Sequence, residues 1–208
     1  MTEVQDAGVS DGRVSDGRAA RRERNIISVL DVVVEMFGEG ELFPTVEQVS
    51  KRSGISVRSI YRYFVEPAQL YDAAIRHHRQ LWAPLAHLPA VGEGPLDQRI
   101  EDFVAMRIRL YDGVAAAYRA TVHNASHHPR VQDELTRSRN DLRLQFELQF
   151  APELAAHKPS QRAALINSGD LLTQLDSLDL LRHHRQLSKA ATTEALRVGL
   201  AAIFNLPT

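Results

Sequence analysis

The chain has 208 residues, of which 44% are hydrophobic and 25% charged, a composition typical of a folded globular protein rather than a disordered one. It has no run of roughly 18 to 20 apolar residues that could span a membrane, and its first residues lack the apolar core of a secretory signal. It contains no cysteine, which excludes disulfides, thiolate nucleophiles and cysteine-ligated zinc. We therefore expect a cytoplasmic protein.

The formal net charge is −1, but it is distributed unevenly along the chain. Residues 1–17 are acidic overall, whereas residues 18–64 carry eight positive and six negative side chains. The remainder, residues 65–208, is neutral overall. A basic module on a neutral body predicts a contact with a polyanion that is confined to one end of the molecule.

The first seventeen residues are polar and contain the direct repeat VSDGR at 9–13 and 14–18. With two Asp-Gly steps and no apolar periodicity, residues 1–17 predict a flexible arm. Arg18, Arg21, Arg22 and Arg24 follow it. These arginines are either the solvated start of a helix or an arm that reaches phosphates or the minor groove of DNA.

Four helices are predicted next. The first carries an apolar stripe with helical spacing and stops at Gly38. Thr45, with a glutamine three residues later, forms a capping box for a short second helix that ends at Gly54. Ser56 caps a third short helix, VRSIYRYF, and Pro67 opens a fourth that reaches about residue 83.

Prolines and the sequence GEGP predict a break near residues 84–95. The rest of the chain again has helical periodicity without sustained strand alternation, so we expect an all-α protein. Its later helices are predicted at 95–112, 113–125, 129–150, 159–181 and 188–204.

The segment from Thr45 to Phe64 is predicted to form a short helix, a turn at a glycine and a second short helix. In the second of these helices Ile60 and Phe64 share an apolar face, whereas Arg58, Tyr61 and Arg62 lie on the opposite side. Arginines beside an aromatic residue suit a helix in the major groove, where arginine can pair bidentately with guanine. The alternative is an ordinary helical hairpin with a polar outer face.

Residues 26–70 resemble the DNA-binding domain of the tetracycline-repressor (TetR) family of bacterial transcriptional regulators. The matching segments are IISVLDVVVEMFGEGE, PTVEQVSKRSGISVRSIYRYF and PAQLYDAAI. The C-terminal LDLLRHHRQLSKAATTEALRVGLAAIF is similar to the family's last two helices. The resemblance implies a helix-turn-helix domain over 18–66, a linking helix over 67–83, and a helical bundle for ligand binding and dimerisation over 84–208.

The resemblance further implies a homodimer that leaves a palindromic operator when a small molecule enters the C-terminal domain. Thr45 would then touch a phosphate at the start of the second helix. The third helix and its cap would supply the other DNA contacts, from Ser56, Val57, Arg58, Ser59, Tyr61, Arg62 and Tyr63. Two positions depart from the family pattern. Arg58-Ser59 replaces a frequent Gly-Thr, and Pro67 stands where a phosphate-binding lysine is common.

A ligand site is predicted from polar residues on otherwise apolar helix faces. Arg107 falls inside an apolar stripe, and Asn167, Asp170 and Gln174 share one side of a later helix. These four polar residues have three possible roles. They lie on solvated edges of their helices, or Arg107 and Asp170 pair with each other. Alternatively, they hold the polar or anionic group of a largely apolar ligand that binds between helices 96–111 and 160–181. The ligand hypothesis uses Phe103, Met106, Arg107, Leu110, Phe146, Asn167, Asp170 and Gln174.

Leucines are concentrated in the last two predicted helices, where they form either ordinary core or a two-fold dimer seam. The resemblance favours the seam, with the residues Leu172, Leu175, Leu196, Leu200 and Ile203. The nine histidines include His123 and His127 at helical spacing, but no HExxH motif. We expect no metal, no cofactor and no catalytic residue.

The sequence therefore predicts a ligand-responsive regulator that binds double-stranded operator DNA as a homodimer and acts as a repressor. Two alternatives from other classes stay open. One is a helical small-molecule-binding protein or enzyme that does not bind DNA. The other is a helical adaptor for a protein partner. Strong salt dependence of binding to duplex DNA separates the regulator from both.

Overall fold

The computed structural model describes residues 11–41 and 43–205, with side chains from residue 17 onward. Within these residues the chain forms helices and loops without a strand, which confirms the all-α prediction. The chain divides into two compact units, with the division after Arg79.

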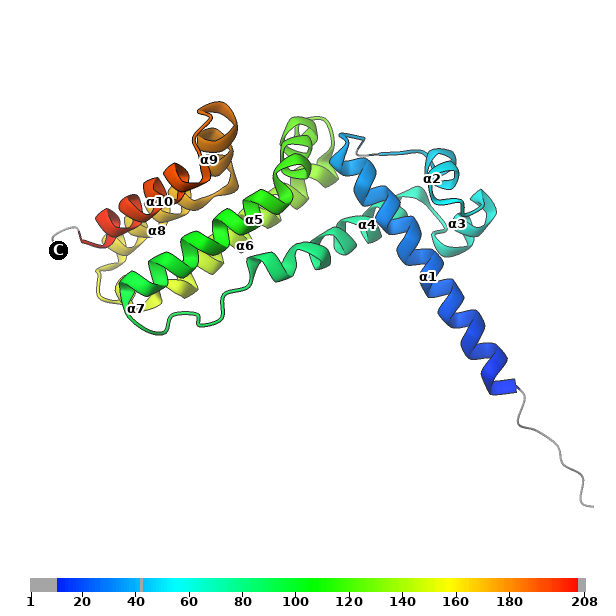
Figure 1. Ribbon diagram of the computed structural model, residues 1–208, viewed down its shortest axis with the longest axis horizontal. Coiled ribbons are helices and arrows are strands. Elements are labelled where there is room, and N and C mark those ends of the chain that lie inside the picture. The colour runs from blue at the N-terminus through cyan, green and yellow to red at the C-terminus, as the bar shows by residue number, and fades with distance from the viewer. Residues whose placement is uncertain (1–10, 42, 206–208) are drawn as a thin grey trace, which may run out of the picture. The chain divides into compact units, whose positions relative to one another are not determined.

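The first unit contains α1 (Asp11–Gly38), α2 (Val46–Ser53), α3 (Val57–Tyr63) and most of α4 (Pro67–Trp82) (Figure 1). Helix α1 packs against both α2 and α3. Apolar side chains from all four helices are buried, as the periodicity predicted. They include Val29, Val33, Val49, Ile60, Leu70 and Ala74.

Helix α1 is longer than the sequence predicted. It begins at Asp11, so residues 11–17 are helical and not the flexible arm that we expected, while residues 1–10 of that arm lie outside the described residues. Once the amphipathic part of a helix has formed, each added residue gains a backbone hydrogen bond without a new nucleation step. Residues 17–24 are all exposed, so this end of α1 presents its arginines to solvent.

The second unit is a helical bundle built around α5 (Leu96–Ala125) and α6 (Pro129–Gln149), which lie side by side (Figure 1). Helix α10 (Lys189–Phe204) packs on α5, and α8 (Pro159–Thr173) packs on both α6 and α10. Short elements complete the unit: the 3-10 helix η1 (Ala83–Ala86), α7 (Ala151–Ala155), α9 (Leu175–Asp179) and the π-helical turn η2 (Leu180–His184).

The two helices predicted at 95–112 and 113–125 are one continuous helix, α5. Gly113 lies within it, and a Cβ atom added there would come within 2.4 Å of Leu85 Cδ1 and 3.2 Å of the Trp82 ring. The glycine therefore allows α5 to approach the η1 segment closely. It is a packing residue and not a helix end.

The helix predicted over 159–181 is interrupted at Gln174, which is extended (φ −66°, ψ 152°) between α8 and α9. The Gln174 amide Nε2 donates to Arg139 O at 3.1 Å and to Asp170 Oδ1 at 2.5 Å. These bonds hold the break between the two helices. Sequence periodicity could not show it, because Gln174 is an ordinary helix former.

Candidate functional site

The helix-turn-helix segment is fixed by caps at both helix starts. Thr45 Oγ1 accepts from Gln48 N at 3.2 Å, and Gln48 Oε1 accepts from Thr45 N at 2.6 Å, which confirms the capping box. Gly54 closes α2 in the left-handed conformation (φ 70°), where a side chain would be strained. Ser56 caps α3 by accepting from Ser59 N at 3.3 Å. The turn and the direction of α3 are thus set locally.

The two faces of α3 differ as the sequence predicted. Ile60 is 1% exposed and Phe64 is 8% exposed, so both anchor α3 to the core of the first unit. Arg58, Tyr61 and Arg62 are exposed on the other side. A short helix that keeps two cations and an aromatic ring in solvent has the side chains that contact base edges and phosphates.

Tyr63 connects α3 with the basic start of α1. The guanidinium of Arg62 lies 5.3 Å from the centre of the Tyr63 ring, and that of Arg22 lies 5.8 Å from it. The Tyr63 hydroxyl accepts from Asn25 Nδ2 at 3.2 Å and from Arg62 Nη2 at 3.4 Å. These hydrogen bonds hold the pKa of Tyr63 below its usual value, and the bond from Asn25 has the larger effect. The exposed residues Arg22, Arg58, Tyr61 and Arg62, with half-buried Tyr63, form what we call the basic face.

The remaining residues predicted to contact DNA lie at the starts of α2 and α3, on α3 itself and on α1. Thr45 and Ser56 are exposed at their caps, and Val57 and Ser59 are partly buried. Ser56 Oγ and Ser59 Oγ are 3.0 Å apart and hydrogen-bonded to each other. Arg18 and Arg21 are exposed on α1, and their contact with DNA stays a prediction.

Two polar contacts of the first unit were not predicted from the sequence. Arg52 on α2 forms a double hydrogen bond with Glu39, at 2.5 Å to each carboxylate oxygen, and so ties α2 to the end of α1. Asn25 orients Tyr63 from thirty-eight residues away. Neither residue stands out in the sequence, because each partner belongs to another element.

The apolar residues of the predicted ligand site pack in the hydrophobic core of the second unit. Phe103, Phe146 and Phe150 are fully buried and pack with ring centres 5.0–5.9 Å apart. Met106 is fully buried and Leu110 is 7% exposed in the same core. Helices α6 and α10 each pack on both α5 and α8, and the aromatic rings occupy the interior, so a pocket with these residues as walls stays a prediction.

Arg107 is fully buried without a carboxylate at ion-pair distance in the described part of the chain. Its Nη2 donates to Leu142 O at 2.7 Å and its Nη1 to Gln145 Oε1 at 2.5 Å, and the guanidinium lies 4.5 Å from the centre of the Phe103 ring. Burial lowers the pKa of Arg107 to about 9, although the negative charge of Asp170 raises that pKa to a smaller extent. Arg107 therefore does not pair directly with Asp170, which was one of the alternatives that the sequence left open.

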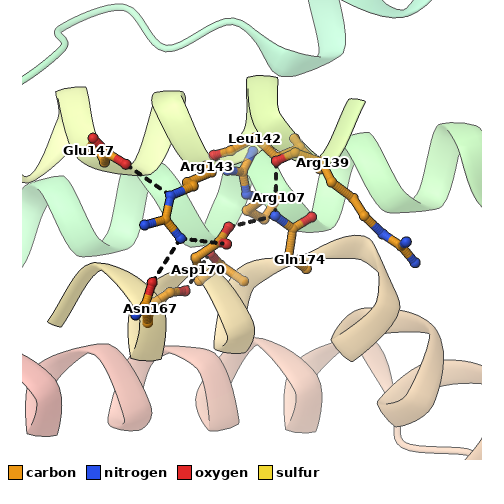
Figure 2. A network of polar contacts seen from close by, with 10 residues as sticks. Arg107, Arg139, Leu142, Arg143, Glu147, Asn167, Asp170 and Gln174 are labelled. Carbon is orange, nitrogen blue, oxygen red and sulfur yellow. Dashed lines mark hydrogen bonds and ion pairs between the residues drawn. The ribbon is translucent and has the colours of Figure 1, made fainter. Parts of the chain in front are cut away.

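The polar half of the predicted site lies at a groove of about 570 Å³ beside α6, α8 and α9. Asn167, Asp170 and Gln174 line it, together with Arg139 and Arg143, which sequence reasoning missed. Arg143 Nη1 donates to Asn167 Oδ1 at 3.0 Å and to Asp170 Oδ2 at 3.4 Å, so it joins α6 to α8 (Figure 2). We call this the polar groove.

The residues predicted to form a dimer seam are mostly core. Leu175, Leu196 and Leu200 are at most 6% exposed and pack within this chain, while Leu172 and Ile203 are half-buried against the same core. Leu175, Leu196 and Leu200 therefore pack inside this chain, and a dimer seam that includes them stays a prediction. Leu171 and Val198, one on α8 and one on α10, are instead 72% and 51% exposed.

One solved structure similar to this chain is that of a tetR-family transcriptional regulator from Streptomyces coelicolor. The similarity covers 87% of this chain and 80% of that one, with a TM-score of 0.67 and 19% sequence identity. The chain has the TetR-family fold. The resemblance seen in residues 26–70 is thus confirmed at the level of the fold, and over much more of the chain.

No model of a protein family matches the chain, and a search of curated proteins finds no relative. None of the described helices combines the length and the apolar character that a membrane span requires. In the described part of the chain no three histidine, aspartate or glutamate side chains are grouped so that they could hold a metal ion.

Proposed function

We propose that this protein is a DNA-binding transcriptional regulator that inserts α3 into the major groove of an operator. The observation that carries the proposal is the basic face itself. Arg58, Tyr61 and Arg62 are exposed on a helix whose start, turn and underside are held by caps and buried side chains. A rigid helix with arginines on its solvent side can pair with guanine edges without first ordering itself.

The proposed DNA contact extends to α1. Arg22 shares the Tyr63 ring with Arg62, so the two cations lie close enough to face the same stretch of phosphate backbone. Thr45 and Ser56 expose their hydroxyls at helix starts, where backbone N–H groups also favour an anion. These groups would position the protein, and Arg58 and Arg62 would read the sequence.

The direct test is binding to the DNA upstream of its own coding region, measured by fluorescence anisotropy at several salt concentrations. We expect the logarithm of affinity to fall linearly with the logarithm of salt concentration, because phosphate contacts release counterions. A footprint with two-fold symmetry should accompany it. Affinity that does not change with salt would contradict the proposal.

We further propose that the regulator is a homodimer, joined through the outer face of α8 and α10. This face carries small and apolar exposed side chains on two neighbouring helices, namely Ala164, Ser168, Leu171, Ala191, Ala195 and Val198. Two copies packed through it would form a four-helix seam. The recognition helices of the dimer must be about 34–36 Å apart, or a multiple of that spacing, to enter major grooves on one side of DNA.

Sedimentation of Val198→Glu and Leu171→Glu tests the dimer, with Leu144→Glu as the control. Leu144 is 54% exposed on α6, outside the proposed seam. We expect monomers from the first two variants, because a charge would be buried in an apolar seam, and a dimer from the control. A monomeric unmodified protein, or a dimer in all three variants, would contradict the seam.

The regulator is proposed to repress, and to leave its operator when a small molecule binds the second unit. The polar groove supports a ligand site there. An effector that prefers the DNA-free state must weaken DNA binding by the same factor by which DNA weakens effector binding. A reporter under the upstream DNA should become more active when the protein is deleted, and unchanged or lower activity would contradict repression.

The polar groove also favours a second candidate function, a small-molecule-binding helical protein that does not bind DNA. It predicts ligand binding with no salt-dependent affinity for any duplex. The anisotropy experiment above therefore separates the two functions.

A further inference from the structure

The polar groove has balanced charge and an unusual buried acceptor. Its lining includes two arginines, Arg139 and Arg143, and two aspartates, Asp170 and Asp176. Each arginine is paired with an aspartate on the other side: Arg143 with Asp170 at 3.4 Å and Arg139 with Asp176 at 2.5 Å. Arg139 and Arg143 are one helical turn apart on α6, so their side chains lie on the same face.

Gln174 contributes the acceptor. Only 9% of its surface is exposed, and it lines the groove. Its Nε2 donates to Arg139 O and to Asp170 Oδ1 (Figure 2), and because both partners are acceptors the amide orientation is settled. Its Oε1 is left buried without a hydrogen-bond partner in the described residues. Such an acceptor favours a ligand that brings an N–H or O–H donor.

The charges limit what the ligand can be. Burial is the largest single influence on Asp176 and would by itself raise its pKa, but the effects of Arg139 and Tyr118 together hold that pKa below its usual value. The aspartate therefore stays ionised and neutralises its arginine. A ligand with only a negative charge would meet these carboxylates, and one with only a positive charge would meet the arginines. A ligand with both charges can replace one Arg–Asp ion pair of the groove by two ion pairs between ligand and protein. The net charge of the groove then stays the same.

We propose that the polar groove binds a small zwitterion of the amino acid class, whose ammonium group donates to Gln174 Oε1 and Asp170 and whose carboxylate accepts from Arg143 and Arg139. Ammonium supplies the missing donor, and guanidinium pairs well with carboxylate. The claim that the zwitterion regulates DNA binding rests on the proposed function. The claim that the groove binds a zwitterion rests on the groove alone.

The test is isothermal titration calorimetry of the full chain, without DNA, against each of the standard L-α-amino acids. The best amino acid is then compared with its N-acetyl derivative, which lacks the cation, and its methyl ester, which lacks the anion. We expect a Kd of about 10 µM to 1 mM for at least one amino acid, and binding about tenfold or more weaker for each derivative.

Arg143→Gln should weaken that binding about tenfold or more, since a charged partner of the carboxylate is lost. Arg137→Gln is its matched control on the same helix, because Arg137 is exposed and pairs with Glu134 outside the groove. Gln174→Met removes the acceptor in a side chain of similar size and should have a similar effect on Kd. A melting curve shows whether the Gln174→Met variant folds. If it does not fold, Arg143→Gln alone tests whether the groove binds the amino acid.

Three results would overturn the proposal: no amino acid binds at millimolar concentration, either derivative binds as well as its parent, or Arg143→Gln and Arg137→Gln bind alike. Adding the best amino acid to the anisotropy assay then tests regulation. Calorimetry uses no DNA, so a failed zwitterion site leaves the proposed DNA binding intact. A protein that binds the amino acid but no duplex would contradict only the proposed function.

Discussion

Arg58 and Arg62 in the first unit and Arg107 in the second lie in opposite environments. Arg58 and Arg62 on α3 are exposed and held by a helix that local caps define. Arg107 on α5 is fully buried; its Nη2 and Nη1 donate to a backbone carbonyl and a glutamine, while its Nε has no hydrogen-bond partner in the described residues. Exposed arginines keep their hydration and can exchange it for DNA, whereas a buried arginine costs stability unless its donors are satisfied. Arg58 and Arg62 of the first unit thus point outward, whereas Arg107 of the second unit joins α5 to α6.

The polar contacts of the second unit depend on a packed aromatic core. Phe146 contacts Phe103 and Phe150 and lies so close to Gly169 on α8 that a Cβ there would come within 2.0 Å of its ring. By contrast, Tyr61 in the first unit is 43% exposed. The comparison predicts a structural role for Phe146 in the second unit and a binding role for Tyr61 in the first.

The largest expected effect is that of Phe146→Ala. It should lower the free energy of unfolding by about 3–5 kcal/mol, because it removes a buried ring and leaves a cavity. Tyr61→Ala should change that free energy by no more than about 0.5 kcal/mol and yet weaken DNA binding. Urea denaturation and anisotropy measure the two effects. Equal losses of stability in both variants would contradict the contrast between the units.

A loss of stability in acid is expected next, in the first unit. Burial, and to a smaller extent the neighbouring His77, lowers the pKa of His78 to about 4 from a usual value of 6.5. Between these pH values the unfolded chain binds more protons, so stability is present above pH 6.5 and falls as pH is lowered toward 4. The loss should be roughly 3 kcal/mol.

His78→Leu removes this titrating group, and urea denaturation at several pH values between 6.5 and 4 should show a shallower decline. His87→Gln serves as the control, because His87 is exposed. If the decline is the same in both variants and in the unmodified protein, His78 is not its source.

Arg58→Ala should weaken operator binding by about 1–3 kcal/mol and relax the preference at one base position, with no change in stability. Arg137→Ala is the control, because Arg137 is an exposed arginine of α6 in the second unit. Binding is measured by anisotropy on operator variants with single base changes. Unchanged affinity and specificity for Arg58→Ala would show that α3 presents a different face to DNA.

The smallest effect is expected at the α2 cap. Thr45→Ala removes the acceptor of Gln48 N and should lower the stability of the first unit by about 0.5–2 kcal/mol, whereas Thr45→Ser keeps that hydroxyl and should restore most of it. Urea denaturation of both variants measures this difference. If serine is no better than alanine, the hydroxyl does not stabilise the cap.

The parts of the fold that depend on neighbours in sequence were predictable. Thr45 with Gln48, Gly54 and Ser56 act over at most four residues, and the structure confirms each of them. The contacts that complete the sites were not predictable. Asn25 and Tyr63, or Arg143 and Asp170, meet only because separate helices pack together. Buried and interface leucines share one pattern, so Leu196 and Leu200 could be placed only by the packing of α10.

The sequence alone determined the all-α class, the helix-turn-helix with its caps and its basic side, because these follow from periodicity and short-range hydrogen bonds. Only the tertiary structure decided where the later polar residues go. Arg107 is buried and donates to Leu142 and Gln145 on α6, while Asn167, Asp170 and Gln174 line a groove with two unforeseen arginines. Such pairings join residues more than twenty positions apart, and their energy depends on burial and distance, which no single helix pattern contains.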